Sequence, residues 1–207
     1  MRPWMVPIGV ALLALVLMAV ALVKGGSGAA PAKPSAPAPA SPAVAASSQV
    51  GGAFTLVDQK GRAVTDADLK GKPTLMFFGF TYCPDVCPTT LTLLTAWMKA
   101  LGPDADKLNV VFVTVDPERD TPKQMALYLS SFDPRIRGLT GTPGQVSQVA
   151  HAYNVYYQKV PIDGGGYTMD HSTSIYLMDG RGAFSSTMDY QTPTDEAVMT
   201  LHQLIHA

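Results

Sequence analysis

Cysteine is nearly absent from this chain of 207 residues, which contains only Cys83 and Cys87. Two cysteines form one disulfide at most, which excludes a small fold held together by several disulfides. The part of the chain that contains them is also long enough to bury a core without such cross-links. We therefore expect the pair to have a chemical role and not an architectural one.

An excess of positive charge is also missing. The chain has 15 Lys and Arg against 16 Asp and Glu, and a formal net charge of −1. A nucleic-acid-binding protein needs a basic surface to meet phosphates, so the charge balance does not favour such a partner. The hydrophobic fraction of 47% is ordinary for a globular protein, and the length suits one domain with some chain left over.

Charge is absent altogether between Trp4 and Val23, and Lys24 ends this apolar run. A helix of this length spans about 30 Å, the thickness of a bilayer core. We predict a transmembrane anchor over residues 1–24. A cleaved signal peptide is the alternative, because Ala19-Val20-Ala21 has the pattern of a cleavage site. The apolar run continues past that pattern, which favours an uncleaved anchor.

The location of the protein is predicted from the few residues before the apolar run. Arg2 and the amino group favour an N-terminus inside and an exported remainder. No Arg- and Ser-rich transit peptide precedes the run, so we expect the bacterial inner membrane and not a mitochondrion. The soluble part of the chain would then lie in the periplasm.

Residues 25–49 consist almost entirely of Gly, Ala, Pro and Ser. Such a composition cannot bury a core, and we predict a disordered, flexible linker. In an extended, polyproline-like form the linker would reach roughly 70 Å. A tether of this kind would let a soluble domain reach a partner in the same membrane.

Residues 50–207 alternate between apolar runs of strand length and helical patterns. We predict a hairpin that turns at Gly61, two buried strands, four helices and three further strands. The strands are expected at Thr74–Phe80, Leu108–Val115, Val155–Val160, Ser174–Met178 and Ala183–Met188, and the helices at Leu91–Leu101, Pro122–Phe132, Pro143–Tyr153 and from Pro193 onward. This order predicts an α/β, thioredoxin-like fold with a central mixed sheet flanked by helices.

Three of the predicted helices share one start signal. Thr121, Thr142 and Thr192 each precede a proline, and each has a polar residue three positions later. This pattern predicts a threonine N-cap, a proline at the first helical position and a capping box.

The two cysteines lie between a predicted buried strand and a predicted helix, in F-T-Y-C-P-D-V-C-P. We expect Cys87 at the N-cap of that helix, with Pro88 at the first helical position. A helix N-terminus favours the thiolate, so Cys87 is predicted to be more acidic than a free cysteine. Asp85, between the cysteines, would either add negative charge near a bound cation or solvate the loop.

The spacing of the cysteines leaves several chemistries open. The usual redox dithiol is C-x-x-C, and here one more residue separates the sulfurs, although a disulfide remains sterically possible. A zinc site would need four ligands, and no second cysteine pair exists. Two thiolates and one imidazole suit copper, above all Cu(I).

A third ligand would have to come from one of four histidines. His202 and His206 lie four positions apart on the last predicted helix, but a solvated helix face is the simpler explanation, and His151 is expected on a helix surface. His171 directly precedes an apolar strand, in a loop that would face the start of the cysteine helix. Cys83, Cys87 and His171 are therefore the candidate ligand set.

Three segments together resemble the signature blocks of the Sco/SenC family. They are F-T-Y-C-P-D-V-C-P, V-D-P-E-R-D-T-P (Val115–Pro122) and Y-T-M-D-H-S (Tyr167–Ser172), and the resemblance covers residues 51–207. It implies a membrane-anchored, thioredoxin-like copper protein that helps to assemble the CuA site of cytochrome c oxidase. It also implies that Cys83, Cys87 and His171 bind copper, as Cu(I) or Cu(II).

Several other residues near these blocks have simpler explanations. Asp116 and Asp120 match family positions, but their segment is also expected to form a turn and a helix cap. Met169 has a sulfur that could bind copper, although packing explains it as well. Gly164–Gly166 would give mobility to the loop of His171 or form a plain surface turn.

Three functions are consistent with this site. The first is a copper chaperone that delivers copper to the copper subunit of cytochrome c oxidase, with another periplasmic copper chaperone as a further expected partner. The second is a thiol–disulfide oxidoreductase in which Cys83 and Cys87 reduce cysteines of that subunit. The third is a redox or copper sensor. Pure disulfide exchange has no need of His171, so this residue favours copper binding.

Overall fold

The structure is a computed structural model, and it describes residues 50–207. The predicted anchor and linker lie outside the described residues. Within residues 50–207, no helix has both the length and the apolar character needed to cross a bilayer.

A sheet of seven strands forms the centre of the domain, in the order β2-β1-β5-β4-β3-β8-β9. Its three middle strands β3, β4 and β5 are parallel, and the outer pairs are antiparallel, so the sheet is mixed as predicted. The strands are β1 (Thr55–Asp58), β2 (Ala63–Thr65), β3 (Thr74–Gly79), β4 (Asn109–Thr114), β5 (Ile136–Thr140), β8 (Ile175–Met178) and β9 (Phe184–Met188).

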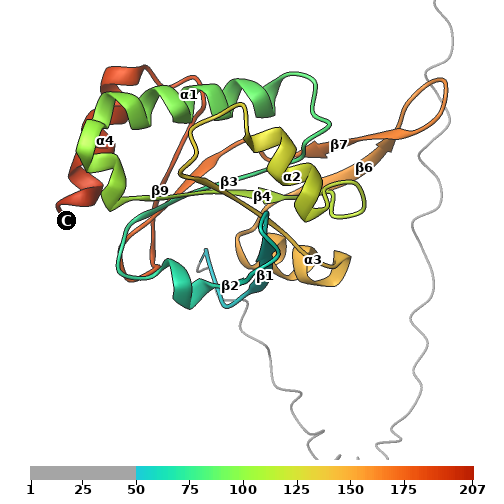
Figure 1. Cartoon of the computed structure of the whole chain (residues 1–207), viewed down its shortest axis with the longest axis horizontal. Helices are drawn as coiled ribbons and strands as arrows, with labels where there is room; N and C mark the ends of the chain where they lie inside the picture. Colours follow the sequence, from blue (N-terminus) through green and yellow to red (C-terminus); the bar gives the residue numbers. More distant parts are fainter. Residues whose placement is uncertain (1–49) are drawn as a thin grey trace, which may run out of the picture. The chain divides into compact units, whose positions relative to one another are not determined.

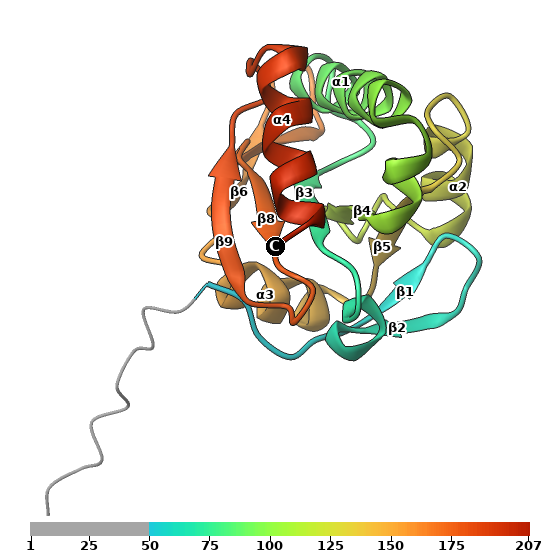
Figure 2. The same ribbon diagram turned by 90° about the vertical axis from the view of Figure 1, so that its left-hand side faces the viewer.

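Both faces of the sheet are covered, which explains why β3 is a continuous apolar run with all six residues buried. Phe77 and Phe112 stack on one face, and Tyr128 of α2 (Pro122–Leu129) packs against Phe112. On the other face, Phe78 contacts Tyr153, at the end of α3 (Pro143–Ala152). Figure 2 shows α1 (Val86–Leu101) beside α4 (Thr194–Ile205) on the side of the sheet opposite α3.

Two strands lie outside the central sheet. β6 (Tyr157–Pro161) and β7 (Tyr167–His171) form an antiparallel hairpin that projects from the domain in Figure 1. Gly164–Gly166 form its tip with positive φ angles of 87°, 100° and 87°, a conformation in which glycine avoids strain. These glycines therefore make a surface turn.

The predicted elements largely agree with the structure, and the differences lie at β5, β7 and the starts of α1, α2 and α4. Strands β5 and β7 were not predicted, and both carry charged residues that interrupt their apolar pattern. The helix α4 begins at Thr194 with Pro193 as N-cap, so the predicted cap at Thr192 is wrong. Thr142 forms the full capping box.

Thr121 caps α2 with its side chain, but its capping box is incomplete. Its hydroxyl accepts the backbone N–H of Gln124 at 3.3 Å. The side chain of Gln124 does not return to the cap; it reaches the hydroxyl of Thr81 at 3.3 Å. Two short 3-10 helices, η1 (Asp66–Leu69) and η2 (Gly102–Lys107), complete the domain.

Candidate metal centre

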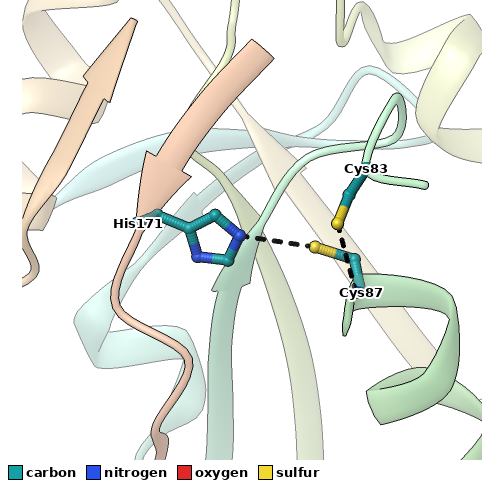
Figure 3. Close-up of side chains that lie close together, drawn as sticks. All are labelled: Cys83, Cys87 and His171. Atoms are coloured by element: carbon teal, nitrogen blue, oxygen red, sulfur yellow. Dashed lines mark hydrogen bonds between the residues drawn. The ribbon is translucent and has the colours of Figure 1, made fainter. Parts of the chain in front are cut away.

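The structure brings Cys83, Cys87 and His171 together although His171 lies 84 positions after Cys87. Cys83 lies in the loop after β3, Cys87 is the second residue of α1, and His171 is the last residue of β7. Their two sulfurs and one ring nitrogen all lie within 4.8 Å of one another. Figure 3 shows the three side chains pointing toward one another, with Cys87 Sγ 3.6 Å from His171 Nε2.

The start of α1 differs from the prediction. The helix begins at Val86 with Asp85 as its N-cap, so Cys87 is the second helical residue and Pro88 the third. The side chain of Asp85 makes no capping hydrogen bond and is exposed. The sulfur of Cys83 takes this role, because it accepts the backbone N–H of Cys87 at 3.4 Å. The N-terminus of the helix therefore stabilises the thiolate of Cys83 and not that of Cys87.

The prediction that Cys87 is more acidic than a free cysteine is wrong, and Cys83 is the more acidic thiol. The hydrogen bond from the thiol of Cys87 is the largest cause that lowers the pKa of Cys83, against the opposing effect of burial. The same hydrogen bond, together with burial, raises the pKa of Cys87. Cys87 is completely buried and Cys83 is half-buried. Cys83 is thus the thiol that ionises first.

Gly79 makes room for Cys87 at the end of β3. A Cβ atom at this position would lie 2.7 Å from Cys87 Sγ and 2.8 Å from the ring of Phe112. Both distances are too short for real atoms to adopt without movement. The absence of a side chain at Gly79 therefore lets α1 place its sulfur directly against the sheet.

His171 is held with one ring nitrogen toward the thiols. Its Nδ1 lies 2.8 Å from the carbonyl oxygen of Ser172, and a carbonyl can only accept, so Nδ1 carries the proton. Nε2 is therefore the ring nitrogen that faces Cys87 and can offer a lone pair to a metal. Phe80 and Phe77 contact the imidazole edge-on, with ring centroids at 5.7 and 6.4 Å. A fixed tautomer is what a metal-binding histidine requires.

A buried carboxylate ties the cysteine loop to the loop after β4. Asp120 accepts the backbone N–H of Thr81 at 3.0 Å and the hydroxyls of Thr81 and Thr114 at 2.6 Å each. It is completely buried, and burial raises its pKa although the threonine hydroxyls oppose that effect. The sequence analysis matched Asp120 to a family position but also explained it by a turn and a helix cap, so this role was not predicted.

Arg119 joins three segments around the site. Its guanidinium lies over the rings of Tyr167, at 3.8 Å, and Tyr82, at 4.8 Å. It also pairs with the buried carboxylate of Asp116 and donates to the carbonyl oxygen of Tyr167 at 2.9 Å. The hydroxyl of Tyr167 completes the cluster with a hydrogen bond to Asp116 at 2.9 Å. This cluster holds the β6–β7 hairpin, and with it His171, against the cysteine loop.

The remaining candidate residues lie outside this centre. His151 is exposed on α3, which covers the opposite face of the sheet. His202 and His206 belong to α4 and its C-terminal end. Met169 is buried in the core, as its packing interpretation predicted.

Two thiols and one imidazole nitrogen form a soft, three-membered donor set. Both cysteines are free thiols in the structure. Sulfur and imidazole ligands favour Cu(I) over hard cations such as Mg²⁺ or Ca²⁺. The same two sulfurs lie close enough to one another for thiol–disulfide chemistry.

Relatives in several organisms resemble this chain. The human "Protein SCO2 homolog, mitochondrial" is 46% identical over 137 residues, 65% of this chain and 52% of that protein. The Arabidopsis thaliana "Protein SCO1 homolog 1, mitochondrial" is 38% identical over 77% of this chain and 49% of that protein. The chain thus spans about half the length of these curated relatives.

Solved structures resemble the domain as well. The structure of Bradyrhizobium japonicum ScoI with copper bound is 53% identical, with a TM-score of 0.72, over 75% of this chain and 99% of that one. Yeast Sco1 with copper bound is 36% identical, with a TM-score of 0.72, over 77% of this chain and 90% of that one. The family model described as SCO1/SenC matches residues 42–206. The chain therefore belongs to the SCO1/SenC family.

Proposed function

We propose that this protein binds one copper ion through Cys83, Cys87 and His171 and delivers it to the CuA site of cytochrome c oxidase. The convergence of two free thiols and one oriented imidazole within 4.8 Å carries this proposal. Copper is bound in the structures of Bradyrhizobium japonicum ScoI and yeast Sco1. The Sco family is described as one of cytochrome c oxidase assembly proteins, which supports the oxidase copper subunit as the recipient.

Differences in exposure suggest how copper would leave the site. Cys87 is buried under the sheet and His171 is held by Ser172, whereas Cys83 is half-buried beside the exposed ring of Tyr82. A thiolate of the recipient would reach the ion from the side of Cys83 and replace this ligand first. Another periplasmic copper chaperone is a proposed donor, and it would approach from the same side.

We also propose the location that such a role requires. Residues 1–24 would anchor the chain in a bacterial inner membrane, residues 25–49 would act as a flexible linker, and residues 50–207 would form the copper-binding domain in the periplasm. The apolar run that ends at Lys24 and the Ala- and Pro-rich segment after it support this arrangement.

Thiol–disulfide exchange is the second candidate function, and the low pKa of Cys83 favours it. The Cys83 thiolate would attack a disulfide of the oxidase subunit and form a mixed disulfide, while one partner sulfur leaves as a thiolate and takes up a proton. Cys87, once deprotonated, would then attack Cys83, release the second partner thiolate and leave a Cys83–Cys87 disulfide. The partner disulfide is reduced to two thiols, and this chain is oxidised by the same two electrons. No feature of residues 50–207 specifically supports a sensor role.

The decisive experiment compares the full chain with its His171→Ala and His151→Ala variants. Each is loaded with Cu(I) under anaerobic conditions, and its copper affinity is measured by competition with a chelator. In parallel, each is mixed with an oxidised peptide of the oxidase copper site. We expect His171→Ala to lose tight copper binding and His151→Ala to keep it.

The peptide assay separates the two functions. A His171→Ala variant that reduces the peptide at the normal rate would assign dithiol exchange to the cysteines and copper binding to the full triad. Unchanged copper affinity in His171→Ala would overturn the proposed ligand set. Copper transfer from the wild type to the reduced peptide would support the proposed delivery of copper.

A further inference from the structure

A second group of candidate ligands lies at the far end of α1. Asp104 belongs to η2, His202 lies in the last turn of α4, and His206 is the C-cap of α4. One carboxylate oxygen and two ring nitrogens of these residues lie within 4.8 Å of one another. Asp104 Oδ2 is 3.3 Å from His202 Nδ1.

The fold sets the positions of these three side chains. His202 and His206 are four residues apart, so they lie one above the other on the same side of the helix. Their rings are parallel within 6°, with centroids 6.3 Å apart. The helices α4 and η2 are in contact, and the neighbouring residues Leu201 and Ala105 are buried. The donor atoms thus lie at the edge of the contact between α4 and η2, where they are accessible to solvent.

We propose that Asp104, His202 and His206 bind one divalent cation of the Zn(II) or Cu(II) class. Bonds from these metals to imidazole nitrogen and carboxylate oxygen are about 2.0–2.2 Å long, so donor atoms around one ion lie roughly 3–4 Å apart. The three donor atoms already lie within 4.8 Å of one another, and side-chain rotations would bring them to this separation. Two imidazoles and a carboxylate suit borderline cations, and Cu(II) binds such ligands more tightly than Zn(II).

This site differs from the cysteine centre in both position and chemistry. The α1 helix has 16 residues and is therefore about 24 Å long, and the two groups lie at its opposite ends. The cysteine centre has soft sulfur ligands, whereas this one has none. The proposal therefore adds a second ion, of a harder class, to the single copper ion of the proposed function.

Lys107 competes with a metal for the carboxylate. Its ammonium lies 2.8 Å from Asp104 Oδ1, while Asp104 Oδ2 faces His202. A cation bound by Oδ2 would be repelled by this ammonium. Removal of the charge at Lys107 should therefore tighten metal binding.

The test titrates the full chain with Zn(II) and Cu(II) in a Cys83→Ser/Cys87→Ser background, which removes the thiol ligands. Calorimetry gives stoichiometry and affinity, and electron paramagnetic resonance of the Cu(II) form reports nitrogen ligands. We expect one equivalent, coupling to two nitrogens, and an affinity that falls at least tenfold in His202→Ala and in His206→Ala. Asp104→Asn should weaken binding less, and Lys107→Gln should tighten it several-fold.

The matched control is His151→Ala, which removes another exposed histidine and should leave the titration unchanged. If the background variant fails to fold by circular dichroism, His206→Ala is compared with the wild type, where it should lower the Zn(II) stoichiometry by one equivalent and leave Cu(I) binding intact. Equal stoichiometry and affinity with and without His202 and His206 would overturn the proposal. A defect in Cu(I) binding at the cysteines would leave it untouched.

Discussion

The two ends of helix α1 each meet a group of three candidate ligands, and the groups are built differently. At the N-terminal end, Cys87 is completely buried and its partners come from a loop and a distant hairpin. At the other end, His202 and His206 lie on one helix at the surface, with Asp104 on the neighbouring η2. One group depends on the whole fold, and the other on a single helix junction.

Because of this difference, the two groups would select different metal ions. A buried sulfur site held by Gly79, Asp120 and Arg119 has little freedom to rearrange, so it can enforce a low coordination number on a soft ion. An exposed pair of histidines can rotate and take up water as a further ligand, which suits ordinary divalent cations.

The largest effect is expected from the loss of a sulfur ligand. Cys87→Ser should lower the Cu(I) affinity on the order of a hundred-fold or more, because removal of a direct ligand exceeds the 10–100-fold loss typical of its supporting groups. Chelator competition under anaerobic conditions measures it. His206→Ala is the matched change at the other end of α1 and should leave Cu(I) affinity unchanged. Equal losses in both variants would remove the contrast between the two ends.

The close approach of α1 to β3 gives the second prediction. Gly79→Ala places a Cβ atom 2.7 Å from Cys87 Sγ, so either the helix or the sulfur must move. We expect the free energy of unfolding to fall by about 1–3 kcal/mol, as in other overpacked cores, and Cu(I) affinity to fall more than tenfold. Urea denaturation and chelator competition measure the two effects.

Gly144→Ala is the control for that substitution. Gly144 lies in α3 on the opposite face of the sheet, and a Cβ atom there meets nothing within 4 Å. Its stability should stay the same or rise slightly, because alanine favours a helix more than glycine does. If Gly79→Ala behaves like Gly144→Ala, the contact between Cys87 and the sheet does not constrain the site.

The third prediction concerns the support of the cysteine loop. Asp120→Asn weakens the hydrogen bonds of Thr81 and Thr114, and we expect a cost of about 1–3 kcal/mol in unfolding free energy. Copper affinity should fall about tenfold, at the lower end of the range for supporting groups. Asp106→Asn, at an exposed ion pair with Arg135, should cost less than about 1 kcal/mol and leave copper binding alone. Similar values for both would show that the hydrogen bonds of Asp120 do not support the cysteine loop.

Much of this architecture could be predicted from the sequence because its signals are local. The apolar run of β3, the threonine cap of α3 and the glycine turn of the first hairpin all depend on neighbouring residues. Strand β5 was missed because Arg137 and Gly138 interrupt its pattern, and Gly138 is needed where Leu129 of α2 packs against the strand. Such contacts between distant segments leave no local pattern.

In the candidate centre, too, the features that depend on local sequence were predicted and those that depend on contacts in the fold were not. The residue types and the family resemblance selected Cys83, Cys87 and His171, and the structure places them together. The acidity predicted for Cys87 was wrong, because its thiol donates a hydrogen bond to Cys83 and is buried; the N-cap also lies two residues earlier than predicted, at Asp85. That shift turns Cys83 toward the helix N-terminus, and the sequence pattern alone cannot specify it.

The smallest expected change is in the alkylation rate of Cys83 with pH, and it tests this corrected order of acidity. Because the pKa of Cys83 lies well below its ordinary value, its thiolate persists as the pH falls from 8 to 6, and iodoacetamide should modify it at a rate that changes only a few-fold. A free cysteine slows on the order of a hundred-fold over this range. Mass spectrometry of the metal-free full chain identifies the modified residue, and buried Cys87 should stay unmodified. Cys87→Ala removes the main hydrogen bond to Cys83 and should restore part of the pH dependence; an ordinary thiol profile in the wild type would contradict the proposed order.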